Sequence, residues 1–264
     1  MELRLKKRID SILFEKDFYE SRSKAQAAVM TGKVFVNGQK VIKSGDKFNE
    51  DDILIEVKED FPYVSRGALK LLTAMREFEI DFDKVTAIDI GASTGGFTDV
   101  MLKNGAKKVL ALDVGYNQLH YSLRTNDKVI CLEKTNARTF EDKTLLNSFD
   151  VAVGDLSFIS ITKIYENMRK YVKDSGILIF LIKPQFEACK NEIGKRGLVK
   201  DILIHRRIIL DIIEFINSFE DTVENLCPSD IKGNKSGNQE YLIKIIKKNN
   251  KKPLYEEMLK KAGL

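Results

Sequence analysis

The sequence predicts an α/β protein with a Rossmann-like, mostly parallel sheet that has helices on both faces, preceded by a small α+β domain. From residue 65 onward, short apolar runs alternate with amphipathic stretches long enough for helices. Before residue 61, two helical patterns are followed by a hairpin signal instead. An acidic, proline-containing segment at residues 59–62 separates the two patterns. We therefore expect domains at residues 1–60 and 65–264, joined by a short ordered linker at residues 61–64.

The first domain is expected to contain two short helices and a β-hairpin. Apolar residues at helical spacing predict a helix around residues 9–13. Ser21 or Ser23 is a suitable N-cap for a second helix over residues 24–31. Asn37-Gly38 is a strong hairpin signal between apolar runs. The strands expected in this domain are residues 34–36, 41–42 and 53–57.

Positive charge is concentrated near the start of the chain. Residues 1–44 hold ten Lys and Arg against five Asp and Glu, so their net charge of +5 equals that of the whole chain. A basic face on a small domain is typical of proteins that bind a phosphate backbone. An ordinary solvated helical face gives the same count, so the charge alone leaves both interpretations open.

Composition excludes several other classes of protein. Apolar residues make up 43% and charged residues 31%, unlike disordered or collagen-like chains. Three cysteines without a CxxC pair, and only two histidines, argue against a structural zinc site and favour a reducing compartment. The N-terminus has no apolar signal region, and the longest strongly apolar run is residues 177–182. We therefore expect a soluble cytoplasmic protein without a metal or a membrane span.

The second domain is expected to begin with a helix over residues 68–78. The strands expected after it are residues 85–90, 109–112, 129–132, 151–153, 177–182, 223–226 and 241–246. Helices are expected between them, for example at residues 97–103 and 161–172, and a short one at 254–259. Ligands bind at the carboxyl ends of the strands in such sheets. The residues directly after each strand therefore carry most of the functional information.

A glycine-rich loop follows the first of these strands, in the segment Asp89–Phe97 (DIGASTGGF). Its spacing differs from that of a dinucleotide motif, because Ser93 stands where the second glycine belongs, and it lacks the Gly-Lys-Ser/Thr of a P-loop. Asp113 ends the second strand 22 residues after Gly91, where a carboxylate accepts hydrogen bonds from ribose hydroxyls. Together these features favour S-adenosylmethionine, although a tight turn and a surface Asp give the same pattern.

Polar residues also mark the later strands. Asp155 follows the fourth strand, Lys183 follows the fifth, and Glu240 lies where a Gly/Asn-rich loop at residues 228–241 meets the last strand. The turn at Asp155 lacks the prolines common in methyltransferases that act on exocyclic amines, which disfavours an amine acceptor. Each residue alone is a common surface charge. Their placement at one edge of one sheet indicates a shared site.

These motifs resemble the TlyA family of rRNA 2′-O-methyltransferases, also called haemolysins, along essentially the whole chain. The first domain is similar to a small RNA-binding domain named after a small-subunit ribosomal protein, and the second to FtsJ-type Rossmann methyltransferases. The motifs that carry the resemblance are Tyr63–Leu71 (YVSRGALKL), Asp89–Phe97, Gly154–Ser160, Lys183–Glu187 and Gly237–Tyr241.

The resemblance implies methyl transfer from S-adenosylmethionine to a cytidine ribose 2′-hydroxyl of large-subunit rRNA, and in one subgroup of small-subunit rRNA too. It implies that the first domain binds rRNA or ribosomal subunits, and it leaves the oligomeric state open. The implied catalytic set is Lys70, Asp155, Lys183 and Glu240. The residues expected to bind the cofactor are Asp89, Gly91, Ser93, Thr94, Gly95, Gly96, Phe97, Asp113 and Asn136.

The chemistry leaves the role of Lys183 open between two alternatives. A ribose hydroxyl is a weak nucleophile, so it needs in-line positioning and help with its proton. Lys183 acts as a base if burial and the neighbouring Lys70 favour its neutral form, and otherwise it orients the hydroxyl as a cation. Two other functions agree less well with the sequence. A membrane-active haemolysin needs an apolar segment that the sequence lacks, and the complete polar set argues against an RNA-binding protein with an inactive methyltransferase domain.

Overall fold

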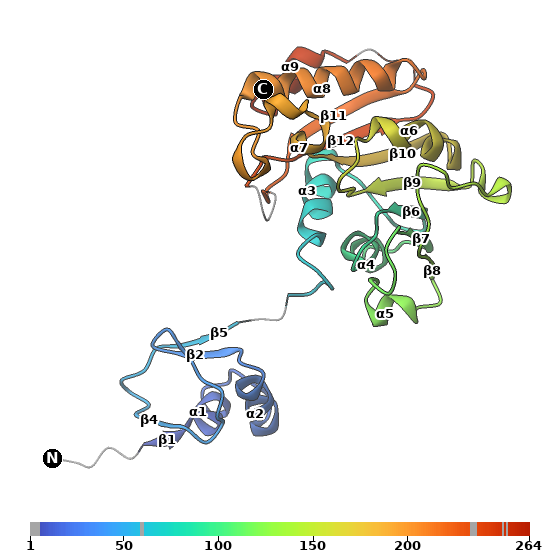
Figure 1. Ribbon diagram of the computed structural model, residues 1–264. Helices are drawn as coiled ribbons and strands as arrows, with labels where there is room; N and C mark the ends of the chain where they lie inside the picture. The colour runs from blue at the N-terminus through green and yellow to red at the C-terminus, as the bar shows by residue number, and fades with distance from the viewer. Residues whose placement is uncertain (1–5, 59–60, 233–236, 250, 252) are drawn as a thin grey trace. The chain divides into compact units, whose positions relative to one another are not determined.

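The computed structural model describes residues 6–58, 61–232, 237–249, 251 and 253–264. The chain forms two compact units, Met1–Pro62 and Tyr63–Leu264, and each is described by itself (Figure 1). Several residues used in the sequence analysis lie outside the described ones: Arg4 of the basic segment, Glu59 and Asp60 before the linker, and residues 233–236 of the Gly/Asn-rich loop.

The first unit packs two helices against small antiparallel sheets. Helix α2 begins after Ser21, whose Oγ accepts a hydrogen bond from the backbone N–H of Lys24, so this N-cap prediction is confirmed. Buried apolar side chains from both helices and from β2 form its core. The helices are α1 (Ile9–Glu15) and α2 (Arg22–Met30), and the strands are β1 (Lys7–Arg8), β2 (Val34–Val36), β3 (Gln39–Lys40), β4 (Lys47–Phe48) and β5 (Ile55–Val57).

The hairpin in this unit is tighter than expected. Asn37 and Gly38 both have positive φ, as a two-residue hairpin turn requires, so pairing starts at once between Val36 and Gln39. The return strand is therefore residues 39–40 and not residues 41–42. Val41 instead turns its side chain into the core, and its N–H donates to Val34 O.

Many basic side chains of the first unit already have acidic partners. Asp10 is fully buried and accepts hydrogen bonds from the guanidinium groups of Arg8 and Arg22. The hydrogen bonds from Arg8 hold the pKa of Asp10 well below its usual range, although burial opposes them. Lys7 lies 2.6 Å from Glu15. This pairing leaves the net charge of the segment unchanged, but it reduces the number of basic side chains that are free to meet a ligand.

The second unit contains, within the described residues, a sheet of seven strands in the order β11-β12-β10-β9-β6-β7-β8. All neighbours from β8 to β10 are parallel, and β12 is antiparallel to both of its neighbours. This confirms the predicted fold class. The strands are β6 (Thr86–Ile90), β7 (Lys108–Leu112), β8 (Val129–Leu132), β9 (Phe149–Gly154), β10 (Val172–Ile182), β11 (Thr222–Pro228) and β12 (Tyr241–Ile246).

Helices cover both faces of this sheet, as Figure 1 shows. Ile179 and Phe180 are adjacent in β10, so they point to opposite faces and enter different apolar clusters. One cluster includes buried residues of α6, α8 and α9, and the other includes those of α3 and α4. The helices are α3 (Ala68–Phe78), α4 (Gly96–Lys103), α5 (Tyr121–Arg124), α6 (Thr162–Met168), α7 (Pro184–Glu187), α8 (Ile202–Asn217) and α9 (Tyr255–Lys261), with 3₁₀ turns at Lys143–Leu145, Arg169–Tyr171, Lys190–Glu192 and Lys195–Gly197.

Two elements differ from the sequence-based expectation. Strand β10 begins at Val172, because Val172 already pairs with Phe149 before the register shifts at Ile177. The helix expected to reach residue 172 ends at Met168 and continues as a 3₁₀ turn. The expectation also omits α8, the longest helix described, although its buried isoleucines have helical spacing.

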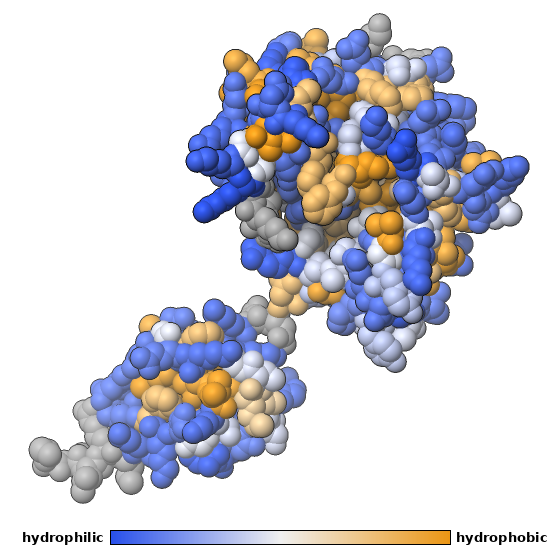
Figure 2. All heavy atoms as spheres, viewed as in Figure 1, coloured by the Kyte–Doolittle hydropathy of each residue, from blue (hydrophilic) through white to orange (hydrophobic). Residues whose placement is uncertain are grey.

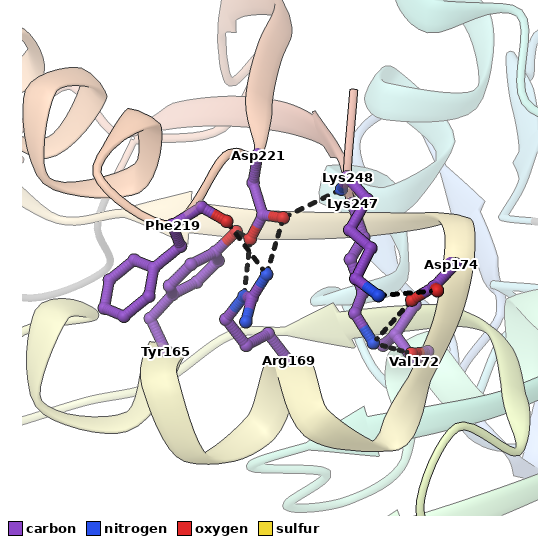
Figure 3. Close-up of polar contacts among 8 residues, drawn as sticks. All are labelled: Tyr165, Arg169, Val172, Asp174, Phe219, Asp221, Lys247 and Lys248. Carbon is purple, nitrogen blue, oxygen red and sulfur yellow. Dashed lines mark hydrogen bonds and ion pairs between the residues drawn. The ribbon is translucent and has the colours of Figure 1, made fainter. Parts of the chain in front are cut away.

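A buried polar cluster around Asp221 connects several segments at the end of the sheet where the parallel strands begin (Figure 3). The Asp221 carboxylate accepts hydrogen bonds from Tyr165 OH at 2.7 Å and from Arg169 Nε at 2.6 Å. It also accepts from the second Arg169 nitrogen and from the backbone N–H of Lys248. Nearby, Lys247 Nζ donates to Val172 O. These contacts join α6, β11 and the turn after β12. No helix among the described residues is long and apolar enough to cross a membrane.

Candidate active site

Four charged side chains meet at the opposite end of the sheet, where the parallel strands end. Lys70 Nζ on α3 lies 2.9 Å from Glu240 Oε2 and 3.1 Å from Asp155 Oδ2. The other oxygen of Asp155, Oδ1, lies 2.7 Å from Lys183 Nζ. The side chains thus form one chain of ion pairs that runs from Glu240 through Lys70 and Asp155 to Lys183. These are the four residues of the predicted catalytic set.

The strand order explains why residues so far apart in sequence meet here. Strands β9 and β10 are parallel neighbours, so Asp155 and Lys183, which follow them, leave the sheet at the same edge. Strand β12 is antiparallel to β10, and its first residue pairs with the last residue of β10, so Glu240 reaches that edge from the other direction. Pro184 at the start of α7 ends β10 directly after Lys183.

Burial and alternating charge define the electrostatics of this set. The side chains of Glu240 and Lys183 are only 3% and 9% exposed. Burial would raise the pKa of Asp155, but Lys183 and Lys70 more than offset this and hold it below its usual value. Burial lowers the pKa of Lys70, whereas Asp155 and Glu240 raise it, and the net direction is upward. Asp155 is therefore an anion and Lys70 a cation near neutral pH.

Two cavities, of about 320 and 390 Å³, lie beside these residues. They share Gly91, Ser93, Asp155 and Ser157 in their walls, so they adjoin. The first cavity is also lined by charged side chains, which are Arg66, Lys70, Asp89, Lys183 and Lys232. The second is more apolar, with walls that include Leu112, Val114, Ala137, Leu156, Ile159 and Ile164. A molecule with a charged end and a flat apolar end fits this pair of cavities.

The glycine-rich loop has two structural roles. Gly91 has φ +81°, and an added Cβ would lie 3.4 Å from Asp155 O and from Leu156, so the loop passes close to the turn after β9. At Gly95 an added Cβ would lie only 2.3 Å from the Leu123 side chain. Gly95 lines neither cavity and serves the packing of α4 against α5. The residues of this loop that line the first cavity are Asp89, Gly91, Ala92, Ser93, Thr94, Gly96 and Phe97.

Asp89 forms part of the wall of the first cavity at the end of β6. Its Oδ2 accepts hydrogen bonds from the backbone N–H of Thr98 at 3.0 Å and from Thr98 Oγ1 at 2.6 Å. Burial raises the pKa of Asp89 to about 7, although both bonds from Thr98 oppose the shift. No cation pairs with this carboxylate among the contacts of the described residues.

Asp113 and Asn136 line the second cavity. The two oxygens of Asp113 accept backbone hydrogen bonds from Gly115 and Ser93, each at 2.7 Å, so the carboxylate joins the loops after β6 and β7. A carboxylate has about four acceptor positions, so Asp113 retains capacity for the hydroxyls of a bound ribose. A carboxylate beside apolar walls fits the nucleoside part of S-adenosylmethionine.

The structure adds functional candidates that the sequence analysis did not assign. Ser157 Oγ accepts a hydrogen bond from Lys183 Nζ at 2.9 Å. The next residue, Phe158, is 89% exposed and has φ +66°, a conformation that bulky residues rarely adopt. Its ring centroid lies 5.1 Å from that of Phe186 on α7. An aromatic residue in the turn directly after Asp155 is the signal that the sequence offered.

Comparison with protein families gives two matches. Residues 63–247 match the FtsJ-like methyltransferase family, and residues 7–54 match the S4 domain. The first match contains all four residues of the ion-pair chain and both cavities. The second lies within the first unit.

Individual relatives are similar over most of the chain. Hemolysin A of Brachyspira hyodysenteriae is 43% identical to this chain, and the alignment covers 90% of this chain and 99% of the hemolysin. The 16S/23S rRNA (cytidine-2′-O)-methyltransferase TlyA of Mycobacterium tuberculosis H37Rv is 35% identical, covering 89% and 88%. A solved structure from Streptococcus thermophilus, described as a hemolysin, is 37% identical with a TM-score of 0.72, covering 98% of this chain and 96% of its own.

Proposed function

Because the chain belongs to the FtsJ-like methyltransferase family, we propose that it transfers a methyl group from S-adenosylmethionine to a cytidine ribose 2′-hydroxyl of rRNA. The observation that carries this proposal is the ion-pair chain of Lys70, Asp155, Lys183 and Glu240, of which the first three line one or both of two adjoining cavities. The name of the Mycobacterium relative, an rRNA cytidine-2′-O-methyltransferase, supports the choice of acceptor.

The cofactor is held by the loops after β6 and β7. When it is bound, Asp113 would accept hydrogen bonds from its ribose hydroxyls, Asn136 and the apolar walls of the second cavity would hold its base, and Gly91, Ser93 and Thr94 would hold its amino-acid end. When bound, S-adenosylmethionine supplies an electrophilic methyl group on a sulfonium. Lys183 lines the first cavity, so it would lie beside this group when the cofactor is bound.

Lys183 acts on the acceptor hydroxyl. Its Nζ is fixed by Asp155 Oδ1 at 2.7 Å and by Ser157 Oγ at 2.9 Å, so it holds a defined place beside the first cavity. From there it holds the 2′-hydroxyl oxygen in line with the methyl group or takes its proton, and the arginine variant described below separates these roles. Lys70, paired with Asp155 and Glu240, keeps Asp155 in place.

The first unit recruits the RNA. We assign residues 1–60 as an RNA-binding domain, residues 61–64 as a linker and residues 65–264 as the catalytic domain, in a cytoplasmic protein. The S4 match at residues 7–54 and the basic side chains of this unit support the assignment. In the second unit, the exposed ring of Phe158 offers a surface on which an unpaired base stacks.

The proposal is tested by mapping ribose methylation on rRNA from cells with and without this gene. We expect one or more cytidines to lose the 2′-O-methyl mark in the deletion strain. The wild-type gene should restore it, and a Lys183→Ala gene expressed at the same level should not. Identical methylation maps in all strains would contradict the function.

A truncation tests the division of roles between the units. Removing residues 1–60 should leave S-adenosylmethionine binding nearly unchanged and weaken rRNA binding, with the lost part steeply dependent on salt. Equal rRNA affinity for the full and truncated chains would contradict the role of the first unit.

A further inference from the structure

The loop between α7 and α8 carries a second group of cations. Its exposed basic side chains are Lys190, Lys195, Arg196 and Lys200. Within the part of the chain that the structure describes, none of the four forms an ion pair. The acidic residue in this segment, Glu192, instead forms an ion pair with Arg207 of α8, in which a guanidinium nitrogen lies 2.7 Å from Glu192 Oε2. Figure 2 shows hydrophilic side chains over this loop, which Figure 1 draws in orange. The loop therefore presents uncompensated positive charge.

Buried side chains hold the backbone of this loop in place. Asn238 Oδ1 accepts from Val199 N at 2.9 Å, and Asn238 Nδ2 donates to Gly197 O at 2.7 Å. His205 is only 4% exposed, and its Nε2 lies 2.9 Å from Val199 O, which as a carbonyl only accepts. The other ring nitrogen of His205 lies 2.9 Å from Tyr241 OH. The basic side chains are thus attached to a backbone that hydrogen bonds hold in place. This reduces the conformational entropy that the loop loses when it binds a ligand.

Arg196 has a conformation that its side chain does not favour. Its φ is +62°, in the left-handed region where glycine is most stable, and Gly197 directly after it has φ +76°. The Arg196 side chain is exposed, so burial does not offset this strain. The turn at Arg196 and Gly197 leaves the guanidinium exposed to solvent, where it can meet a ligand.

The loop is attached to the elements that carry the catalytic set. It begins after α7, which directly follows Lys183. Asn238, which contacts the loop directly, and Tyr241, which contacts His205, lie on either side of Glu240 in the sequence. A ligand bound by the loop is therefore placed relative to both Lys183 and Glu240.

We propose that the segment Lys190–Lys200 is a second RNA-binding surface, in which Lys195 and Arg196 bind phosphate groups of the acceptor RNA and Asn238 and His205 hold that surface in register with the active site. This inference rests on the proposed function, since it names where the same acceptor RNA is bound. A guanidinium donates two parallel hydrogen bonds to a phosphate, and lysine adds a point charge. Asn238 and His205 are positioning residues that act through the loop.

The test compares two double variants of the full chain that remove the same charge. Lys195→Gln with Arg196→Gln removes the proposed contacts, whereas Lys107→Gln with Lys108→Gln removes two exposed lysines at the start of β7, at the opposite end of the sheet. Affinity for an rRNA fragment is measured against salt concentration. We expect the loop variant to bind about tenfold more weakly and to lose roughly 1.4–1.8 from the salt slope, because each phosphate contact contributes about 0.7–0.9. S-adenosylmethionine affinity should be unchanged in both variants.

Two further variants separate charge from folding. Arg196→Gly relieves the left-handed strain, so we expect an equal or higher melting temperature together with weaker RNA binding. Asn238→Ala frees the loop, so we expect a higher KM for RNA and slower single-turnover methyl transfer with unchanged cofactor affinity. If the loop double variant matches the β7 double variant in RNA affinity and salt slope, the inference is wrong. Failure of the wild-type protein to methylate rRNA would instead overturn the proposed function, because RNA binding is measured without methyl transfer.

Discussion

The second unit has two buried charged clusters at opposite ends of one sheet, and they are built differently. Asp221 is saturated by a bidentate arginine, a tyrosine hydroxyl and a backbone N–H (Figure 3). Among the described residues, the ion-pair partners of Asp155 are the flexible ends of two lysines, and Asp155 lines two cavities. Both clusters contain groups with shifted pKa values: those of Tyr165 and Arg169 are raised and that of Asp155 is lowered.

This comparison shows that a shifted pKa alone does not identify an active site. The Asp221 cluster joins backbone segments, so its contacts are those of a structural support. The contacts of Asp155, Lys70, Lys183 and Glu240 join only side chains, which come from four different segments of the chain. The lysine donors among them, Lys70 and Lys183, line the first cavity. We expect the two clusters to respond differently to substitution, with activity lost at one end of the sheet and stability lost at the other.

The largest effect is expected for Lys183→Ala. Groups that position or transfer a proton contribute about 10²–10⁴-fold to a rate, so single-turnover methyl transfer should fall at least 100-fold. Affinity for S-adenosylmethionine, measured by calorimetry, should change little because Lys183 faces the acceptor. Arginine stays protonated, so near-normal turnover in Lys183→Arg would identify Lys183 as an electrostatic positioner and poor turnover would favour a base. Full activity of the alanine variant would remove Lys183 from the catalytic set.

At the other end of the sheet, Asp221→Ala should mainly reduce stability. The Asp221 side chain is fully buried and that of Arg169 is 16% exposed, so the substitution leaves a largely buried guanidinium without its partner. Such a loss costs about 3–5 kcal/mol of the free energy of unfolding. Urea unfolding followed by circular dichroism measures it, with Lys183→Ala as the matched control that should retain most of its stability. A variant with wild-type stability and little activity would reverse our assignment of the two clusters.

Patterns local in the sequence predicted much of this molecule, and the rest depends on tertiary contacts. The order of strands and the residues that follow them placed Asp155, Lys183 and Glu240 at one edge of the sheet. Sequence spacing did not reveal that Gly95 is required by Leu123, because the two meet only when α4 packs on α5. It also did not reveal that Asp10 pairs with both Arg8 and Arg22, since a charge count does not show which side chains meet.

Asp113 is intermediate between Asp221 and Asp155. It accepts hydrogen bonds from the backbone, as Asp221 does, and it lines a cavity, as Asp155 does. Asp113→Ala removes an acceptor for the cofactor ribose, so calorimetry should show S-adenosylmethionine binding weakened by about 1–3 kcal/mol. Asp113→Asn keeps one acceptor oxygen and should lose less. Unchanged affinity in the alanine variant would show that Asp113 only supports the two loops.

A pH-dependent effect on stability is expected at Asp89, a buried carboxylate whose hydrogen bonds come from the neutral donors of Thr98. Its pKa is about 7 in the folded protein against 3.8 for the ordinary group. Between about pH 4 and pH 7 the unfolded chain has therefore released this proton while the folded chain still holds it. The folded state binds more protons there, so the contribution of Asp89 to stability falls as pH rises through this window and is constant above it. Asp89→Asn cannot titrate, so the difference in unfolding free energy between wild type and variant should decline from pH 4 to pH 7 and then level off. Urea unfolding without cofactor at several pH values measures that difference, and a difference independent of pH would show that Asp89 is ionised in the folded protein, as Asp155 is.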